Sequence, residues 1–339
     1  MKVNPFYTLL RVSVFSLWSA VAIADHGSIG FGVGTASPII TNTAITLPKG
    51  MAFFSLLNQY IPFYEISDSN LAAYHDQFGD TRDIHNVGTF IQPVLLAGYG
   101  ITDDFTVAGY MPYVYRTGVK GFGEETDRVE SLGSPNGIGD FRLFGEYRFF
   151  HTEDNLSNLT ALFLVKAPTG ITNRSAILSD SDREVLDTHQ QPGSGSWDGG
   201  LGLSFTQAFG AFSFDSNVLY TWVTKGAQNT NLGDIFSYNF ALSYALGGPS
   251  GVGILASSNL SKWTAVVELN GEWRAKQSTN GVKDPDSGSH ILYLSPGIRW
   301  AGGPNWNLAL SIGAPIVNNL NGIQVKPQYR LLGRFSIAF

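Results

Sequence analysis

The sequence contains no cysteine, so it can form no disulfide and has no thiolate chemistry. Charged residues are only 14% of the chain, well below the roughly 25% of an average soluble domain. No stretch reaches the roughly 18 consecutive apolar residues that a transmembrane helix requires. Nucleic acid is disfavoured as a partner, because phosphate binding needs concentrated lysine and arginine, and acidic residues outnumber basic ones by 27 to 21.

Glycine and aromatic residues are abundant instead, with 39 glycines and an aromatic content of 13%. Low charge combined with many aromatic residues suits a surface that faces lipid. It equally suits a large soluble β-sandwich or barrel. Composition therefore narrows the fold class without deciding it.

The N-terminal segment has the features of a secretory signal peptide. Lys2 and Arg11 form a basic leader, residues 12–24 are apolar or small, and Ala22-Ile23-Ala24 provides a small-x-small cleavage motif. We predict a signal peptide over residues 1–24 and an exported mature chain. Its loss removes two basic residues and no acidic one, so the mature net charge is 19 − 27 = −8.

The last eleven residues, 329–339, alternate with a period of two and have the length of a tilted transmembrane strand. Arg330, Arg334 and Ser336 fall on the other face from the apolar side chains. A terminal Phe preceded by apolar residues two and four places back resembles the assembly signal of bacterial outer-membrane barrels. The residues assigned to this signal are Tyr329, Phe335, Ile337 and Phe339.

Strand-like runs of similar length recur throughout the mature chain. We predict twelve strands, at about residues 51–64, 84–99, 105–116, 137–150, 158–167, 197–209, 211–224, 233–246, 262–276, 290–301, 305–314 and 329–339. Short turns alternate with polar loops such as 65–83, 117–136, 168–196 and 315–327, which is the pattern of an outer-membrane barrel. We expect a short turn at 247–261, although residues 252–260 also fit a strand or irregular structure.

The predicted fold is therefore all-β, a single antiparallel transmembrane β-barrel of about 12 strands over residues 51–339. Residues 25–50 form a periplasmic lead-in that could serve as a plug. In the run from Phe212 to Trp222, aromatic and aliphatic residues alternate with Ser213, Asp215 and Asn217, so lipid would face one side and water the other. A soluble sandwich would reverse these faces. The runs at 51–64, 84–99 and 158–167 do not alternate cleanly, so their register stays open.

Charged residues on the polar faces are predicted to line the lumen. They are Arg142, Glu146, Arg148, Glu268, Glu272, Arg274, Arg299, Arg330 and Arg334. One interpretation is that they pair across strands and brace a closed interior. The other is a narrow, mildly cationic constriction that selects small solutes by charge and size. Twelve strands enclose more room than eight and less than sixteen.

An enzyme is a weaker interpretation, and no catalytic residue or cofactor is predicted. None of the six histidines is expected at mid-strand beside a nucleophile, as a lipid-facing Ser–His pair would require. His75, Asp76, Asp80 and His85 could gather a metal, but a solvated acidic loop explains them better. Residues 284–288 are interpreted as a turn, and no metal site is predicted.

Three short segments resemble the bacterial outer-membrane proteins grouped as the putative MetA-pathway phenol-degradation family. They are Leu47-Pro48-Lys49-Gly50, the segment GITDDFTV at 100–107 and the segment GIGDFRL at 137–143. The resemblance implies an outer-membrane barrel, often described as a transporter, for aromatic or other small compounds.

We therefore expect a Gram-negative outer-membrane channel that passes small polar or aromatic solutes by passive diffusion through a charged lumen. Its expected partners are outer-membrane lipid, the barrel-assembly machinery and a small-molecule solute, with no nucleic acid. The alternative is a non-conducting structural or adhesion barrel that displays acidic extracellular loops.

Overall fold

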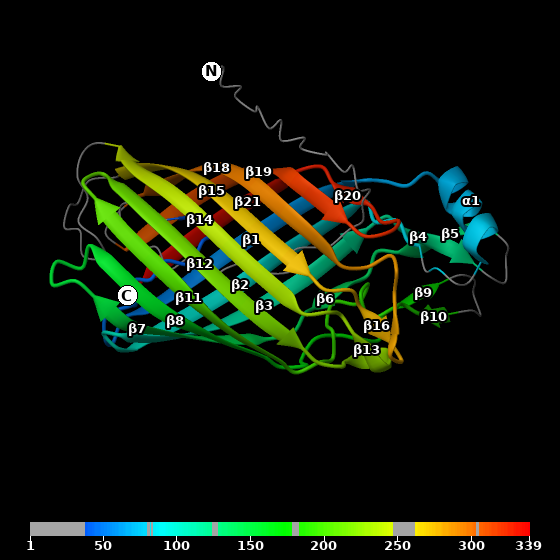
Figure 1. The fold of residues 1–339 in the computed structure, drawn as a ribbon, viewed down its shortest axis with the longest axis horizontal. Helices are drawn as coiled ribbons and strands as arrows, with labels where there is room; N and C mark the ends of the chain where they lie inside the picture. Colours follow the sequence, from blue (N-terminus) through cyan, green and yellow to red (C-terminus); the bar gives the residue numbers. More distant parts are fainter. Residues whose placement is uncertain are drawn as a thin grey trace, which may run out of the picture.

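The computed structural model describes residues 38–79, 82, 84–123, 128–177, 183–246, 262–302 and 305–339. The signal peptide, the first half of the lead-in and the join at 247–261 lie outside these residues. Twelve long strands dominate the chain, as predicted (Figure 1). They are β1 (Ala52–Tyr64), β2 (Thr89–Thr102), β3 (Phe105–Thr117), β7 (Arg142–His151), β8 (Ser157–Lys166), β11 (Asp198–Phe209), β12 (Phe212–Val223), β14 (Ile235–Leu246), β15 (Lys262–Arg274), β18 (Ser289–Ala301), β19 (Trp306–Leu320) and β21 (Arg330–Ala338).

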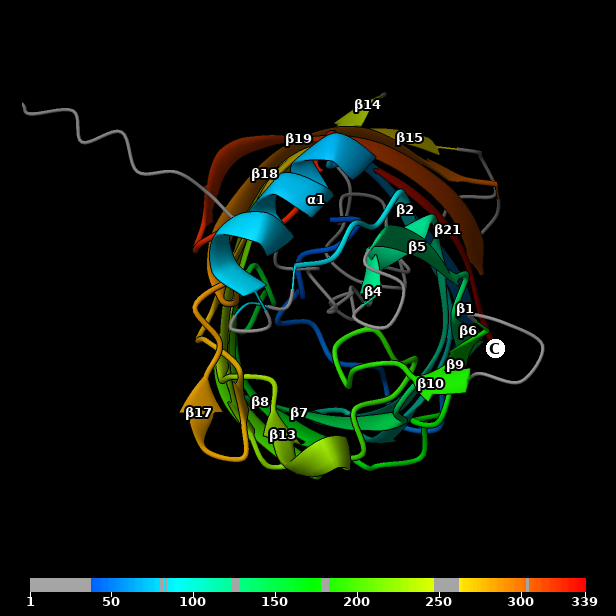
Figure 2. The same ribbon diagram turned by 90° about the vertical axis from the view of Figure 1, so that its right-hand side faces the viewer.

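These strands close into a barrel in which each pairs antiparallel with the next along the chain. The closing seam joins the first and last strands. On β1, Leu56 lies opposite Leu95 of β2 on one side and Phe335 of β21 on the other. The end-on view in Figure 2 shows the resulting ring. Within the described residues, the sheet of twelve long strands closes on itself and leaves no free edge. Its backbone N–H and C=O groups are therefore paired between strands, as a lipid environment requires.

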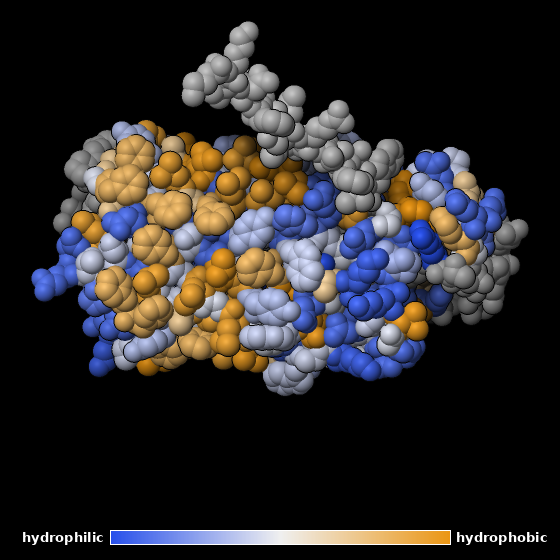
Figure 3. Space-filling model, in the orientation of Figure 1, coloured by the Kyte–Doolittle hydropathy of each residue, from blue (hydrophilic) through white to orange (hydrophobic). Residues whose placement is uncertain are grey.

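Burial alternates along the strands in the sense expected for a barrel in lipid. On β12, Ser213, Asp215 and Asn217 are buried, whereas Phe212 and Trp222 are exposed. The exposed apolar side chains form a band over the strands, and polar residues gather at the loop end (Figure 3). A soluble sandwich would bury the aromatic residues instead, so the structure contradicts that alternative.

Aromatic side chains also gather in a row near one rim. Trp263, Trp300, Trp306 and Phe335 come from four adjacent strands, and successive ring centroids are 5.0–6.4 Å apart. Such rings sit at the boundary between lipid tails and head groups in outer-membrane barrels.

The connections divide between the two ends of the barrel. One end has short turns, among them 103–104, 152–156 and 210–211, and lies close to the C-terminus. The other end has long loops with small elements of their own. These elements are α1 (Asp68–Phe78), β4 (Val119–Gly123), β5 (Arg128–Gly133), β6 (Asn136–Ile138), β9 (Ser175–Ile177), β10 (Arg183–Val185), η2 (Ala227–Asn229), β13 (Thr230–Asn231), β16 (Ser278–Thr279), β17 (Val282–Lys283) and β20 (Lys326–Pro327).

The prediction of a simple polar loop at 65–83 is wrong, because α1 forms there. The Oγ of Ser67 accepts a hydrogen bond from the backbone N–H of Asn70 at 3.3 Å, and Asp68 stands in the first turn, where a carboxylate is favourable. Only Leu71 is buried on this helix. No helix in the described part of the chain is long and apolar enough to cross a membrane.

Three strand boundaries differ from the prediction by five residues or more. β7 begins at Arg142 rather than near residue 137, where the short β6 lies instead. β2 begins at Thr89 rather than near residue 84. β19 continues to Leu320, past Pro315, which the sequence assigns to a loop. The register between β18 and β19 shifts at Leu292/Tyr293, opposite Pro315. This irregularity accommodates a residue that has no N–H to donate to the ladder.

The closing seam can be tested with cysteines, since the chain has none of its own. Leu56 and Phe335 are direct partners across β1 and β21 and point outward. We expect the double variant Leu56→Cys/Phe335→Cys to form a disulfide on oxidation, visible as a mobility shift on non-reducing gels. Leu56→Cys/Leu331→Cys is the matched control. Leu331 pairs with Tyr60, four residues along β1, or about 13 Å away, which is beyond disulfide reach. Equal cross-linking of both pairs would contradict this register.

Candidate functional site

The barrel interior contains a large cavity at the long-loop end. Its volume is about 170 Å³, which is close to that of a cavity that holds one benzene molecule. Its wall combines charged side chains of both signs with apolar ones such as Val114. The charged residues are Arg116, Arg142, Lys166, Arg274, Asp140, Asp198, Asp284 and Asp286. A solute entering between the loops would meet fixed charge and apolar surface together.

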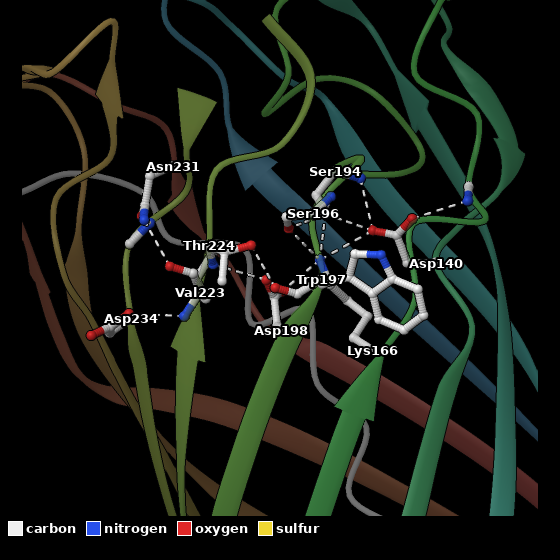
Figure 4. A network of polar contacts seen from close by, with 12 residues as sticks. Asp140, Lys166, Ser194, Ser196, Trp197, Asp198, Val223, Thr224, Asn231 and Asp234 are labelled. Carbon is white, nitrogen blue, oxygen red and sulfur yellow. Dashed lines mark hydrogen bonds and ion pairs between the residues drawn. The ribbon is translucent and has the colours of Figure 1, made fainter. Parts of the chain in front are cut away.

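A buried ion cluster forms part of this wall, at the ends of β8 and β11 (Figure 4). Lys166 Nζ lies 2.6 Å from Asp198 Oδ2 and 3.1 Å from Asp140 Oδ2. It also donates to the hydroxyls of Ser194 and Ser196. All three ionic side chains are at least nine-tenths buried. Buried charges are tolerated when they are paired and hydrogen-bonded, as these are.

The same cluster fixes the longest loop inside the barrel mouth. Asp140 accepts hydrogen bonds from the backbone N–H groups of Gly170 and Ser194, at 2.9 and 2.8 Å, and from the Ser194 hydroxyl at 2.6 Å. Asp198 accepts one from the Thr224 N–H at 3.1 Å (Figure 4). Two ends of the 167–197 loop are thereby held to the wall.

Two arginines on the wall stack on aromatic rings. The Arg142 guanidinium lies 5.3 Å from the ring centroid of Tyr110, and that of Arg116 lies 5.3 Å from Phe90. Arg116 also donates to the backbone carbonyls of Gln190 and Gln191, at 3.2 and 3.1 Å. Stacking fixes the orientation of a guanidinium, and both arginines line the cavity.

A second, smaller cavity of about 40 Å³ lies deeper in the barrel, and Arg142 lines both cavities. Glu272 and Tyr293 form part of the deeper wall, together with Asn270. Arg330 supports it by stacking on Tyr293 at 4.3 Å and donating to Asn270 Oδ1 at 2.6 Å. Asn42 of the lead-in is also part of this lining, so the lead-in bounds the second cavity.

The described part of the lead-in, residues 38–48, lies inside the barrel and is almost wholly buried. The Glu268 carboxylate accepts hydrogen bonds from three consecutive backbone N–H groups, those of Ile39, Ile40 and Thr41, at 2.9–3.2 Å. Arg334 donates to the Ile39 carbonyl at 3.1 Å. A charged acceptor and a charged donor on the wall thus satisfy backbone groups that the lead-in buries.

Further hydrogen bonds attach the lead-in to the opposite wall. The N–H of Ala44 donates to Thr206 Oγ1 at 2.7 Å, and the Ala44 carbonyl accepts from Thr160 Oγ1 at 2.6 Å. The N–H of Leu47 donates to Thr106 Oγ1 at 2.8 Å. The segment therefore crosses the interior from β15 and β21 to β3 in the short-turn half of the barrel.

The nine charged residues assigned to the lumen occupy four settings. Arg142, Glu272 and Arg274 line the cavities, and Glu268, Arg330 and Arg334 hold the lead-in or the deeper wall. Arg299 and Glu146 are buried, and the Glu146 carboxylate has no hydrogen-bond partner among the described residues. Arg148 pairs with Asp104 at 2.8 Å beside a short turn. A role in solute passage stays a prediction for all nine.

The residues assigned to the assembly signal belong to the outer surface or the chain end. Tyr329, Phe335 and Ile337 are half-exposed, and Phe339 is 70% exposed. Their recognition by the assembly machinery stays a prediction.

Sequence reasoning missed Lys166, Asp140 and Asp198. One signal was present, because Lys166 is the single charged residue in an otherwise uncharged strand, β8. Asp198 is the first residue of β11, and Asp140 lies two residues before β7. Their contact with Lys166 depends on the register of the barrel strands, so it could not be predicted from the spacing of these residues in the sequence.

A family model described as "Putative MetA-pathway of phenol degradation" matches residues 81–316, which is more than half of the chain. No curated protein matches the sequence. The fold is similar to the COG4313 outer membrane channel from Pseudomonas putida F1, with a TM-score of 0.61 and 15% identity over 89% of this chain and 100% of that one. The P. putida toluene transporter TodX has a TM-score of 0.44 and 10% identity, over 86% of this chain and 91% of that one.

The closed barrel, its apolar band and the fold match together place the chain in the outer membrane of a Gram-negative bacterium. With more than half of its length matched by the family model, the chain belongs to the family described as Putative MetA-pathway of phenol degradation.

Proposed function

We propose that this protein is an outer-membrane channel that passes small polar or aromatic solutes by passive diffusion. The observation that carries the proposal is the pair of cavities in series inside a closed barrel, with Arg142 lining both. No covalent step and no cofactor is part of this mechanism.

The cavity walls suit a small solute with an apolar body and a polar or anionic tip. Arg142 presents a cation between the cavities, while Pro112 and Val114 supply apolar surface in the first and Tyr293 an aromatic ring in the second. The family description names phenol degradation, and a phenol has this combination of ring and hydroxyl. Fixed guanidinium groups in a narrow, poorly hydrated passage favour anions over cations.

We also propose that the lead-in acts as the plug of this channel. Residues 38–48 bound the deeper cavity at Asn42 and are hydrogen-bonded to both sides of the wall. Passage to the short-turn end then requires the lead-in to shift or to leave a narrow gap beside it. The same bonds favour the second candidate, a non-conducting barrel, and conductance distinguishes the two.

The first prediction from this proposal concerns the pore itself. Full-length protein refolded into planar bilayers should give discrete openings, smaller than those of sixteen-stranded porins because twelve strands enclose less space. Insertion verified by a heat-modifiable gel band, yet without any current, would reject the channel and support the structural barrel.

The second prediction concerns charge selectivity. Arg142→Glu changes the charge between the two cavities by two, so the anion-to-cation permeability ratio from reversal potentials should fall by roughly threefold or more. Lys225→Glu is the matched control, because it makes the same charge change on an exposed loop residue. A similar ratio in wild type and Arg142→Glu would mean that Arg142 does not line the path.

The third prediction concerns the plug. The hydroxyl oxygens of Thr43 and Thr206 are 3.2 Å apart, so cysteines at these positions come within disulfide reach. In the oxidised double variant Thr43→Cys/Thr206→Cys, the disulfide should hold the lead-in in place and keep the pore at its lowest conductance. Reduction of the disulfide should restore the conductance of the wild type. The two single variants provide controls. Unchanged openings in a fully cross-linked sample would show that solutes pass beside a fixed lead-in.

A further inference from the structure

Three metal-ligating side chains meet at the mouth of the first cavity, and they come from two loops far apart in the sequence. His85 precedes β2, whereas Asp187 and His189 belong to the loop between β8 and β11. The candidate ligand atoms of all three lie within 4.8 Å of one another. His85 Nε2 is 4.0 Å from Asp187 Oδ2, and the two imidazole centroids are 5.7 Å apart.

The chemistry of this set is specific. Two imidazoles and one carboxylate suit borderline divalent ions such as Zn²⁺, whereas Ca²⁺ and Mg²⁺ prefer oxygen ligands alone. Three protein ligands with a fourth position left to solvent are the arrangement of an open zinc site. Tetrahedral ligands about 2.0–2.2 Å from zinc are roughly 3.4 Å apart, so no pair of the three atoms needs to close by more than about 1.4 Å.

Both halves of the cluster are held by backbone bonds that do not involve the ligand atoms. Next to His85, buried Asn86 exchanges backbone hydrogen bonds with Lys120 at 2.8 and 3.1 Å. The Asp187 carbonyl accepts from the Gln190 N–H at 2.9 Å, which closes a turn around His189. Arg116 then ties that turn to the wall through its bonds to the Gln190 and Gln191 carbonyls. The side chains are thus presented on anchored backbone, as a binding site requires.

We propose that His85, Asp187 and His189 form a site for a divalent transition-metal ion such as Zn²⁺ at the extracellular mouth of the barrel. The two histidines line the first cavity, so an ion held by them would lie at the cavity wall. Bound metal joins the loop that contains α1 to the 167–197 loop and adds positive charge next to Arg116. Solutes with a carboxylate or phenolate group would meet that charge on entry.

The test is calorimetric titration of full-length, chelator-treated protein in detergent with Zn²⁺ alone. Wild type should bind one ion that His85→Ala and His189→Ala each weaken tenfold or more, because a lost ligand costs at least as much as a lost supporting contact. His151→Ala is the matched control, since His151 is exposed and lies beside a short turn at the other end of the barrel. It should bind as wild type does.

Asp187→Asn keeps the shape of an exposed side chain and removes only its charge, so it tests the site without endangering the fold. It should also weaken binding tenfold or more. Equal affinity in wild type and all three site variants, or no binding by wild type, overturns the proposal. The titration needs no open pore, so a silent bilayer would reject the channel and leave the metal site standing.

Discussion

The structure depends on one constraint, which is that a bilayer core contains no water to satisfy backbone N–H and C=O groups. The pairing of β1 with β21 meets it by removing the last sheet edge. Closure then fixes everything that follows along each strand. Every second side chain must face lipid and every other one the interior, which is why exposed Trp222 and buried Thr221 are neighbours on β12.

Closure also encloses the inward side chains, many of which are charged, so their charges must be paired or hydrogen-bonded inside the barrel. Lys166 meets it with two carboxylates and two hydroxyls, and Arg330 meets it with an aromatic face and an amide. Glu268 meets it in another way, by accepting backbone N–H groups of the lead-in. The wall and the lead-in therefore stabilise each other, and the interior is an ordered polar network with cavities rather than a uniform aqueous tube.

The barrel itself could be predicted because its signal is local. Alternation in runs such as 212–222 and 263–274 depends only on a period of two, which any strand in a barrel must show. The helix α1 was also within reach, since Ser67 and Asp68 form an N-terminal cap and Gly79 follows the last turn. Its single buried residue left too weak an apolar period to reveal it.

The site could be predicted only in part, for a physical reason. Arg142 and Glu272 carry the inward pattern of their own strands, so their positions follow from periodicity. The Lys166 cluster joins three strand ends and a loop, and the His85 cluster joins two loops, so both depend on how the ring brings distant segments together. In β8 apolar and polar residues do not alternate cleanly, so the sequence does not show that Lys166 points inward.

The lead-in has a consequence for the order in which the molecule forms. It precedes β1 in the chain, yet its partners include Asp103 and Arg334, separated from it by 57 and 295 residues. Such distant contacts repay their loop-closure entropy only after most of the chain is in place. The lead-in can therefore reach its final position only when strands from both ends of the chain are in place around it.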